Sequence, residues 1–185
     1  MKKPALILGV IAVVILAGLG IAWRVASGFV ARRAAEAGTE AAVKLAAGGN
    51  VDVDTSSDTL SVRTTDGSAS FSSNGTLPSG FPADIPTPSF GTITSSYSGT
   101  GSGSSGYNVA YSLTSAQAKT ASTTYEDQLK AAGYSVEGTA TSTSGGTTLD
   151  IFSAKKGDKT VAVSVSTAED GSATLNLTVS IDAAN

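Results

Sequence analysis

The sequence of 185 residues contains no cysteine and no histidine. The absence of cysteine excludes a disulfide framework, a thiolate nucleophile, and thiolate-bound zinc or iron-sulfur sites. The absence of histidine excludes the Ser-His-Asp triad and imidazole metal ligands, and it leaves no side chain with an unperturbed pKa near neutrality. We therefore expect no catalytic, cofactor-binding or metal-binding residues, and we expect that the protein is not an enzyme.

Charged residues are scarce as well, at 15% of the chain, whereas about fifty positions are serine or threonine. The five basic residues up to Arg33 come without any acid, but from residue 34 onward 15 acids face 7 basic residues. An acidic C-terminal part argues against nucleic acid as a partner, because nucleic-acid-binding surfaces are basic. A polar, weakly charged and thiol-free composition favours an extracytoplasmic location.

An uncharged run extends from Pro4 to Trp23. About 20 residues at 1.5 Å each match the roughly 30 Å of a bilayer core, so residues 1–23 are predicted to form a cytoplasmic tail and a transmembrane helix. A secretory signal peptide is the alternative, because Lys2 and Lys3 resemble its basic start, but its apolar core is shorter, at about 7 to 15 residues. The sequence favours an uncleaved single-pass anchor in the cell membrane.

Basic residues flank the predicted span on both sides, so flanking charge does not decide its orientation. The composition of the C-terminal part places that part outside the cell. Gly18, Ala22 and Ala26 form a row of small residues along one face of the span, which would let another helix approach closely. Glycine and alanine are also common in membrane helices generally. The row indicates an integral membrane protein complex as partner, in addition to the membrane lipids.

Residues 24–49 are rich in strong helix formers and end in Gly48 and Gly49, which predicts a helical stalk. An interfacial amphipathic helix is the alternative, with Arg24, Arg32 and Arg33 near lipid headgroups.

Residues 50–75 alternate apolar and polar side chains between turn signals, which predicts a small β-meander of three strands. Asp52, Asp54 and Asp58 allow a calcium hypothesis, but an EF-hand loop needs glycine at its sixth position and glutamate at its twelfth. Neither residue is present. The aspartates are therefore interpreted as the solvent-facing side of a strand.

Residues 76–185 are predicted to form an α+β extracytoplasmic domain. Prolines at 78, 82, 86 and 88 hold its entry extended, and Leu77, Phe81 and Ile85 are expected to pack it onto the domain. GTGSGSSG, residues 99–106, is expected to be a flexible loop. The pattern of the domain is β-β-α-β-β-β-β, an antiparallel sheet packed with one helix. The expected strands are 93–97, 107–113, 134–141, 148–154, 160–166 and 173–181, and the helix runs from the Thr114 cap to Gly133.

Two segments carry a resemblance: LPSGFPADIP, residues 77–86, and YEDQLKAAGYSV, residues 125–136. Together they resemble an uncharacterised type of Gram-positive and actinobacterial envelope lipoprotein or single-span protein, with an LPxxFPxDIP-like entry and a YxxxLxxxGW-like helix end. The resemblance covers roughly residues 50–183. It implies location and fold but no activity. The chain departs from the type at Tyr134, where tryptophan is usual, and by its predicted anchor in place of a lipid.

Alternative functions rest on weaker signals. A serine near Lys119 or Lys155, or a carboxylate pair drawn from Asp52, Asp54, Glu126 and Asp127, has a plain interpretation as protein surface. A pilin-like subunit would need an early glutamate within the apolar run, which is absent. An envelope sensor or glycan-binding module would use the face of the sheet that the helix leaves exposed to solvent, with four tyrosines as stacking platforms: Tyr97, Tyr107, Tyr111 and Tyr125. Tyrosines at such strand and helix positions more often pack the core, and that is the alternative interpretation.

The expected function is therefore a non-catalytic, single-pass interaction module outside the cytoplasm. We expect it to be an accessory subunit of a larger bacterial membrane complex, with a respiratory complex as one candidate.

Overall fold

The computed structural model describes residues 52–183, apart from residues 57, 66 and 102. The chain divides into two compact units, Met1–Phe71 and Ser72–Asn185. The predicted span and stalk lie outside the described residues, and so do Gly18, Ala22 and Ala26. In the part of the chain that the structure describes, no helix is long and apolar enough to cross a membrane.

The described part of the first unit consists of three short strands: β1 (Asp52–Thr55), β2 (Thr59–Thr64) and β3 (Gly67–Ser72). β1 pairs with β2 in antiparallel fashion, and β3 is the next neighbour of β2. The hydroxyls of Ser61 and Ser70 are 3.2 Å apart and form a hydrogen bond. Val62 is the buried apolar side chain of β2. The apolar alternation predicted these strands correctly.

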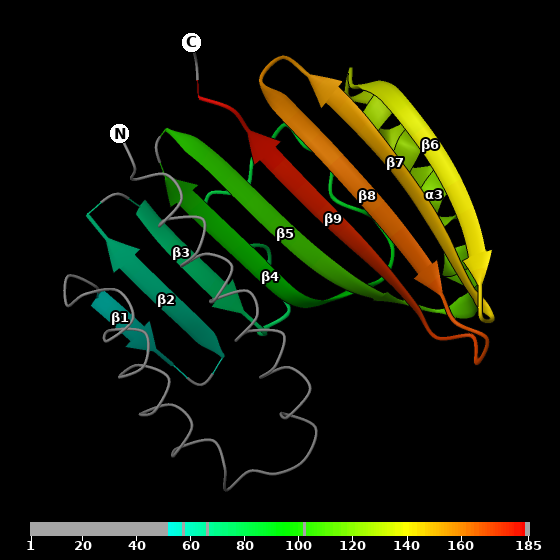
Figure 1. The fold of residues 1–185 in the computed structure, drawn as a ribbon, viewed down its shortest axis with the longest axis horizontal. Helices are drawn as coiled ribbons and strands as arrows, with labels where there is room; N and C mark the ends of the chain where they lie inside the picture. Colours follow the sequence, from blue (N-terminus) through cyan, green and yellow to red (C-terminus); the bar gives the residue numbers. More distant parts are fainter. Residues whose placement is uncertain (1–51, 57, 66, 102, 184–185) are drawn as a thin grey trace, which may run out of the picture. The chain divides into compact units, whose positions relative to one another are not determined.

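The second unit has the predicted order of elements, β-β-α-β-β-β-β (Figure 1). Its strands follow the spatial order β4-β5-β9-β8-β7-β6, and the pairs within this sheet are antiparallel. Its elements are β4 (Thr92–Gly101), β5 (Ser104–Leu113), α3 (Ser115–Ala131), β6 (Ser135–Ser144), β7 (Thr147–Lys156), β8 (Lys159–Thr167) and β9 (Ala173–Ile181). The last strand of the chain therefore returns to the middle of the sheet, between β5 and β8.

The helix α3 begins and ends where its sequence signals predict. The Thr114 side chain accepts a hydrogen bond from the Gln117 backbone N–H, and the Gln117 side chain accepts one from the Thr114 N–H. These two bonds satisfy backbone donors that the first turn of a helix leaves free. Gly133 follows the helix with φ of +85°, a conformation that glycine adopts without steric cost.

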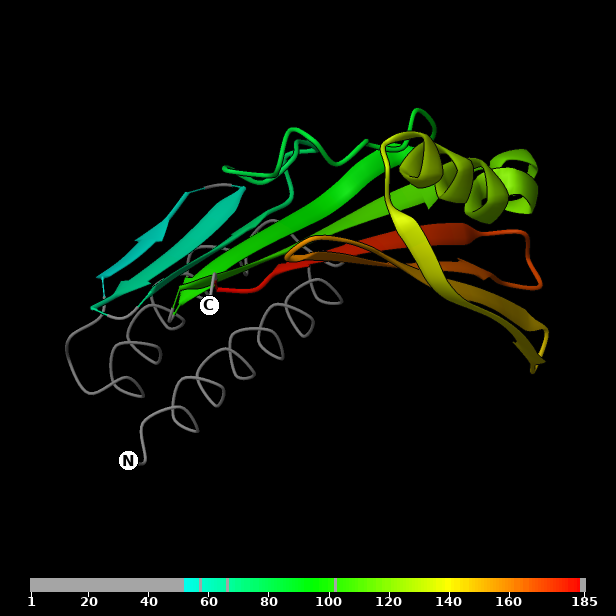
Figure 2. The ribbon, with the colours of Figure 1, turned by 90° about the horizontal axis from the view of Figure 1, so that it is seen from above.

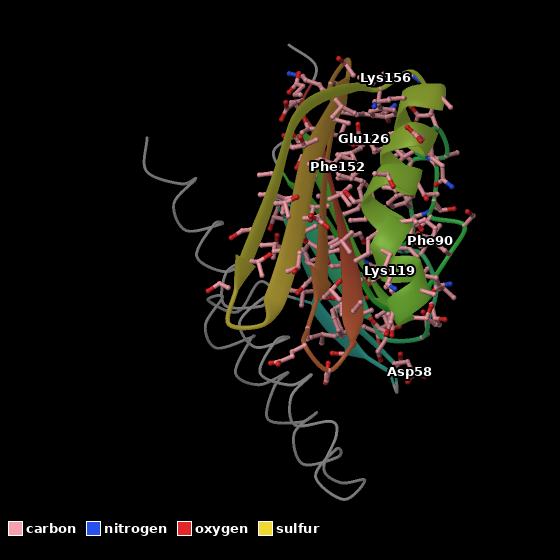
Figure 3. All side chains as sticks on the ribbon, turned by 90° about the vertical axis from the view of Figure 1, so that its right-hand side faces the viewer. Asp58, Phe90, Lys119, Glu126, Phe152 and Lys156 are labelled. Atoms are coloured by element: carbon pink, nitrogen blue, oxygen red, sulfur yellow. The ribbon has the colours of Figure 1, made fainter. Side chains whose placement is uncertain are left out.

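One face of the sheet packs against α3 and forms the core of the unit (Figures 2 and 3). We call it the inner face. The side chains of Ala121, Tyr125 and Leu129 point from the helix into this layer and are at most 1% exposed. They meet alternate residues of the strands, since side chains along a strand alternate between its two faces. Those strand residues include Val109, Phe152, Ala154, Val161, Val163, Val165, Leu175, Leu177 and Val179.

The entry segment, residues 77–90, packs on this core as predicted, except at Leu77. It is not extended as predicted, because the N–H groups of residues 81 and 85 donate to the carbonyls of residues 78 and 82 and close two turns. Ile85 is buried, and the Phe81 ring meets the Tyr107 ring edge-on with centroids 5.7 Å apart. The Tyr125 hydroxyl donates a hydrogen bond of 2.7 Å to the backbone carbonyl of Pro86. Leu77 was predicted to pack with them, but it is 37% exposed. That prediction is wrong, because Leu77 is not among the side chains that pack against the core, whereas Phe81 and Phe90 are.

The prediction of a flexible loop over residues 99–106 is wrong as well. β4 continues to Gly101 and β5 begins at Ser104, so most of the segment is paired strand. Tyr97 explains why glycine is acceptable there, because its hydroxyl would lie 2.5 Å from a Cβ built on Gly99. The ring therefore covers a strand glycine that has no side chain to pack. Gly103 makes the tight turn with φ of +82°.

Candidate interaction surface

The face of the sheet opposite α3 is named here the outer face. Its side chains form rows that cross the strands, because residues opposite each other in paired strands share a face. The first row is Tyr97, Asn108, Thr178, Ala162, Ser153 and Gly138. The second row is Ser95, Ala110, Asn176, Ser164, Ile151 and Ala140. The third row is Thr92, Ser112, Thr174, Ser166, Leu149 and Ser142.

None of the three rows contains a charged residue. Most of their members are small, and serine, threonine and asparagine provide neutral donors and acceptors. One such bond joins two strands, because the Asn108 amide donates to the Thr178 hydroxyl over 2.9 Å. Solvated sheet faces usually carry charged side chains among polar ones. Such a surface costs less to dehydrate than a charged one when a partner bonds its hydroxyl and amide groups, so it suits contact with another surface.

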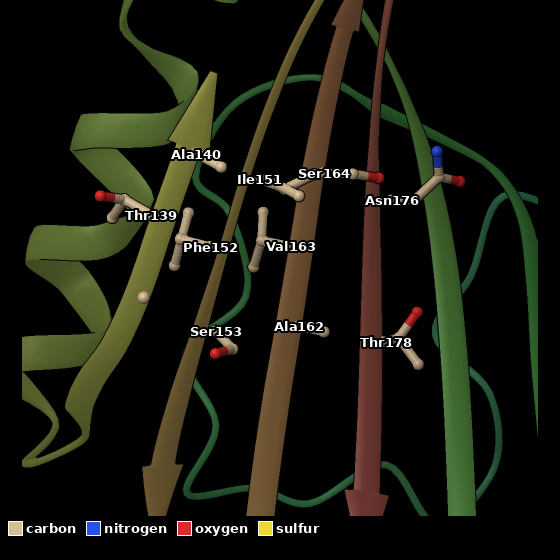
Figure 4. A pocket seen from close by; sticks show the side chains of 11 residues that line it. Thr139, Ala140, Ile151, Phe152, Ser153, Ala162, Val163, Ser164, Asn176 and Thr178 are labelled. Atoms are coloured by element: carbon tan, nitrogen blue, oxygen red, sulfur yellow. The ribbon is translucent and has the colours of Figure 1, made fainter. Parts of the chain in front are cut away.

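A hollow of about 490 Å³ lies on this face over β6, β7, β8 and β9 (Figure 4). Residues of the first two rows line it, among them Ala140, Ile151, Ala162, Ser164, Asn176 and Thr178. Differences in side-chain volume produce the hollow, because the small side chains on β6 and β8 project less far from the sheet than Ile151 on β7. It has no titratable side chain in its lining. It is suited to receiving apolar or hydroxyl-bearing groups and provides no acid or base.

Leu149 and Ile151 are the two large aliphatic side chains of the outer face. Their exposed fractions are 38% and 43%, and they lie two residues apart on β7. Both therefore point in the same direction, away from the core. Completely burying such a side chain is worth about 1.5 to 3 kcal/mol. A partner that covers both would gain the share that is still exposed, which is less than half of that energy for each side chain.

Three of the four tyrosines considered as glycan platforms are core residues, as the alternative interpretation expects. Tyr107, Tyr111 and Tyr125 lie in the layer between α3 and the sheet and are 8%, 3% and 0% exposed. Burial raises the pKa of the Tyr111 hydroxyl to about 12. These three rings pack the core and are inaccessible to a ligand. Tyr97 is the one of the four that lies on the outer face, where it is half-buried.

The charged residues considered as catalytic candidates do not come together in one site. Asp52 and Asp54 belong to β1, where their cross-strand neighbours are Arg63 and Ser61. Glu126 forms an ion pair of 2.6 Å with Lys130, one helical turn away. Among the described residues, there is no group of three or more acidic side chains that could hold a metal ion. Lys155 lies at the end of β7, one cross-strand row beyond the uncharged ones.

A second ion pair attaches the entry segment to the sheet. The Lys159 ammonium lies 2.8 Å from the Asp84 carboxylate. The hydrogen bond from Lys159 lowers the pKa of the Asp84 carboxyl group below its usual value of 3.8. The same bond raises the pKa of Lys159. This pair has a structural role at the rim of the inner layer and lies away from the outer face.

Comparisons of the chain with protein-family models, with curated proteins and with solved structures find no match. The resemblance of residues 77–86 and 125–136 to bacterial envelope proteins therefore stays a prediction.

The sequence predicted that one face of the sheet is exposed to solvent, but not which residues compose it or that Leu149 and Ile151 protrude from it. A signal was present in Leu149, Ile151 and Phe152, because this strand has large apolar residues on both of its faces.

Proposed function

We propose that this protein is a non-catalytic interaction module, anchored in the cell membrane by one span and exposing its folded part outside the cytoplasm. In this proposal it is an accessory subunit of a larger bacterial membrane complex, and a respiratory complex is one candidate. The observation that carries the proposal is the uncharged outer face, from which Leu149 and Ile151 protrude. Packing of the core does not require this composition, so it points to a partner.

The proposed partner presents a flat or gently convex surface with apolar and hydroxyl-bearing side chains. Ala162 and Ser164 on β8 are small and allow close approach, and the hollow beside Ile151 receives one of the partner's side chains. Anchoring in the same membrane raises the effective concentration of the two surfaces, so that a modest interface suffices. The row of Gly18, Ala22 and Ala26 would add a helix contact within the bilayer.

The test is a single charge placed on the outer face. Ile151→Asp would put a carboxylate at the centre of the proposed interface, and Thr124→Asp, on the exposed side of α3, is the matched control. The full chain is tagged at its C-terminus and extracted from membranes in mild detergent, and stoichiometric partners are identified by mass spectrometry. We expect the Ile151 variant to recover at least tenfold less partner, while the control recovers the normal amount. Equal recovery by both variants, or a protein without a stoichiometric partner, would contradict the proposal.

An envelope sensor or glycan-binding module is the second candidate. Tyr97 favours it, because this ring lies on the outer face beside Asn108 and could stack on a sugar. Retention on insoluble peptidoglycan would then fall in the Tyr97→Ala variant and be unchanged in Thr124→Asp. If the unmodified protein is not retained, this candidate is removed.

A further inference from the structure

The strand β6 ends the sheet of the second unit (Figure 1). Within the described part of the chain, no strand pairs with its far side. All of its residues except Val136 are exposed. Such an edge presents unpaired backbone donors and acceptors to any strand that approaches.

The usual protections of an edge strand are almost missing from β6. Its sequence, SVEGTATSTS, contains no proline and no lysine, and Glu137 is its one charged residue. Glu137 lies in the irregular step between Val136 and Gly138, where the pairing with β7 shifts. From Gly138 to Ser144 the strand is regular, uncharged and rich in threonine, which favours extended structure. This stretch is available for pairing.

The turn after β6 determines which backbone groups face outward. Gly145 and Gly146 have φ of +55° and +75°, as in a two-residue type I′ turn between Ser144 and Thr147. The residues that flank such a turn form a hydrogen-bonded pair, and hydrogen-bonded and non-hydrogen-bonded pairs then alternate along the strands. The N–H and C=O groups of Thr139, Thr141 and Thr143 therefore point away from β7, toward the open edge.

We propose that β6 pairs in antiparallel fashion with β6 of a second copy of this chain, so that the two sheets join into one. Thr141 lies on the two-fold axis, opposite its own copy, and Thr139 lies opposite Thr143 of the other copy. This register pairs all the outward donors and acceptors that the turn geometry assigns. It also places Glu137 opposite Gly145, so that no like charges face each other.

The second copy is favoured as the occupant because the strand is complementary to itself. Across the seam threonine faces threonine on the inner side, and Ala140 faces Ser142 on the outer side, pairs of a kind that stabilise sheets. Each outer face then continues across the seam into the other. The two β7 strands, which carry Ile151, would lie about 14 Å apart, at about 4.8 Å per strand spacing. The dimer would therefore present an interaction surface twice as large. This consequence rests on the proposed function.

The absence of native cysteine allows a direct test of the register. Thr141→Cys places the sole thiol on the two-fold axis, where the opposite Cα atoms are about 5.5 Å apart. That separation lies within the range of disulfides, roughly 4.4 to 6.8 Å. Full-length protein in native membranes is oxidised mildly and analysed by non-reducing electrophoresis. We expect a cross-linked homodimer with Thr141→Cys but not with Thr124→Cys on α3. Thr139→Cys should cross-link only when mixed with Thr143→Cys.

A second pair of variants tests the backbone bonds. Thr141→Pro removes an outward N–H that β7 does not use, so the hairpin can tolerate it. Thr141→Val is the control, because both variants lose the hydroxyl bond to Asp150 but only proline loses the N–H. In mild detergent we expect a monomer for the proline variant and a dimer for the valine variant, with unchanged far-ultraviolet circular dichroism. The proposal would be overturned if the proline variant is a dimer or if the unmodified protein is a monomer. It would also be overturned if Thr141→Cys and Thr124→Cys cross-link equally, or if Thr141→Cys cross-links to a different protein.

The two proposals fail separately. If Thr141→Pro becomes monomeric but still recovers the membrane partner, self-pairing is supported and the proposed function stands. If the unmodified protein dimerises through Thr141 but recovers no partner, self-pairing stands and the accessory-subunit proposal fails.

Discussion

The two faces of the sheet in the second unit are made by the same strands, yet they differ sharply in side-chain volume. In β8, Val161, Val163 and Val165 point to α3 and are at most 2% exposed. The residues between them are alanine and serine, and they form part of the outer face. Packing against the helix accounts for the valines. It does not account for three outer rows that lack charge, and the proposed interaction surface rests on this difference.

The largest expected effect is on the inner face. Leu177→Ala removes a side chain that is completely buried under α3, and we expect a loss of about 2 to 5 kcal/mol in unfolding free energy. Thr174→Ala, on the outer face of the same strand, should change it by less than about 0.5 kcal/mol. Thermal and denaturant unfolding of the full chain in mild detergent measures both. Similar losses in the two variants would contradict the assignment of the faces.

Gly99 is an outer-face position where we expect a substitution to lower the unfolding free energy more than Thr174→Ala does. A Cβ at this residue would meet the Tyr97 ring at 2.5 Å from its hydroxyl oxygen, so Gly99→Val must displace the ring. We expect a loss of about 1 to 3 kcal/mol, typical of overpacking. The double variant with Tyr97→Ala should be less destabilised by valine, because the clash is then absent. Equal destabilisation in both backgrounds would show that the ring does not cover the glycine.

Two tyrosine hydroxyls of the inner layer allow a matched comparison, in which we expect smaller changes in unfolding free energy. Tyr125→Phe removes the bond to the Pro86 carbonyl, and we expect a loss of about 1 to 2 kcal/mol. The Tyr111 hydroxyl is buried and has no hydrogen-bond partner among the described residues. Tyr111→Phe should therefore be neutral or slightly stabilising. The same unfolding measurement decides, and a greater loss for Tyr111→Phe than for Tyr125→Phe would reverse this interpretation.

The smallest effect comes from the ion pair at the rim. The pKa of Asp84 is lowered in the folded protein. The carboxylate therefore contributes to stability above its unfolded pKa of 3.8, and this contribution is lost as the pH falls through the folded pKa. The pKa of Lys159 is raised in the folded protein. The ammonium group therefore contributes to stability below its unfolded pKa of 10.5, and this contribution is lost as the pH rises through the folded pKa. Asp84→Asn should flatten the acid limb of a plot of melting temperature against pH. Because the carboxylate is exposed, the change should be small, and an unaltered acid limb would show that the pair contributes nothing.

Local patterns in the sequence predicted the elements of the second unit well. The capping pair Thr114 and Gln117 located the start of α3, and Gly133 located its end. Alternation located the strands, although their ends were placed too early in β4 and β6. Sequence patterns did not predict that β9 lies between β5 and β8, because such pairing depends on contacts between distant residues.

The exposed face of the sheet was predicted, but the residues that meet on it could not be, for the same reason. Its first row brings together Tyr97, Asn108 and Thr178, which are separated by up to about eighty positions in the sequence. The same limit left two interpretations open for the four tyrosines, because alternation shows which residues share a face but not which face the helix covers. The open edge of β6 likewise depends on the strand order.

The central claim is that the outer face contacts a partner in the intact membrane. The most direct measurement replaces Ser164, in the hollow, with a photo-reactive amino acid and compares it with the same replacement at Thr124 on α3. After irradiation of intact membranes, we predict a single heavier cross-linked species from position 164 and none from position 124. Cross-linking from position 124 alone, or from neither position, would contradict the assignment of the outer face as the interaction surface.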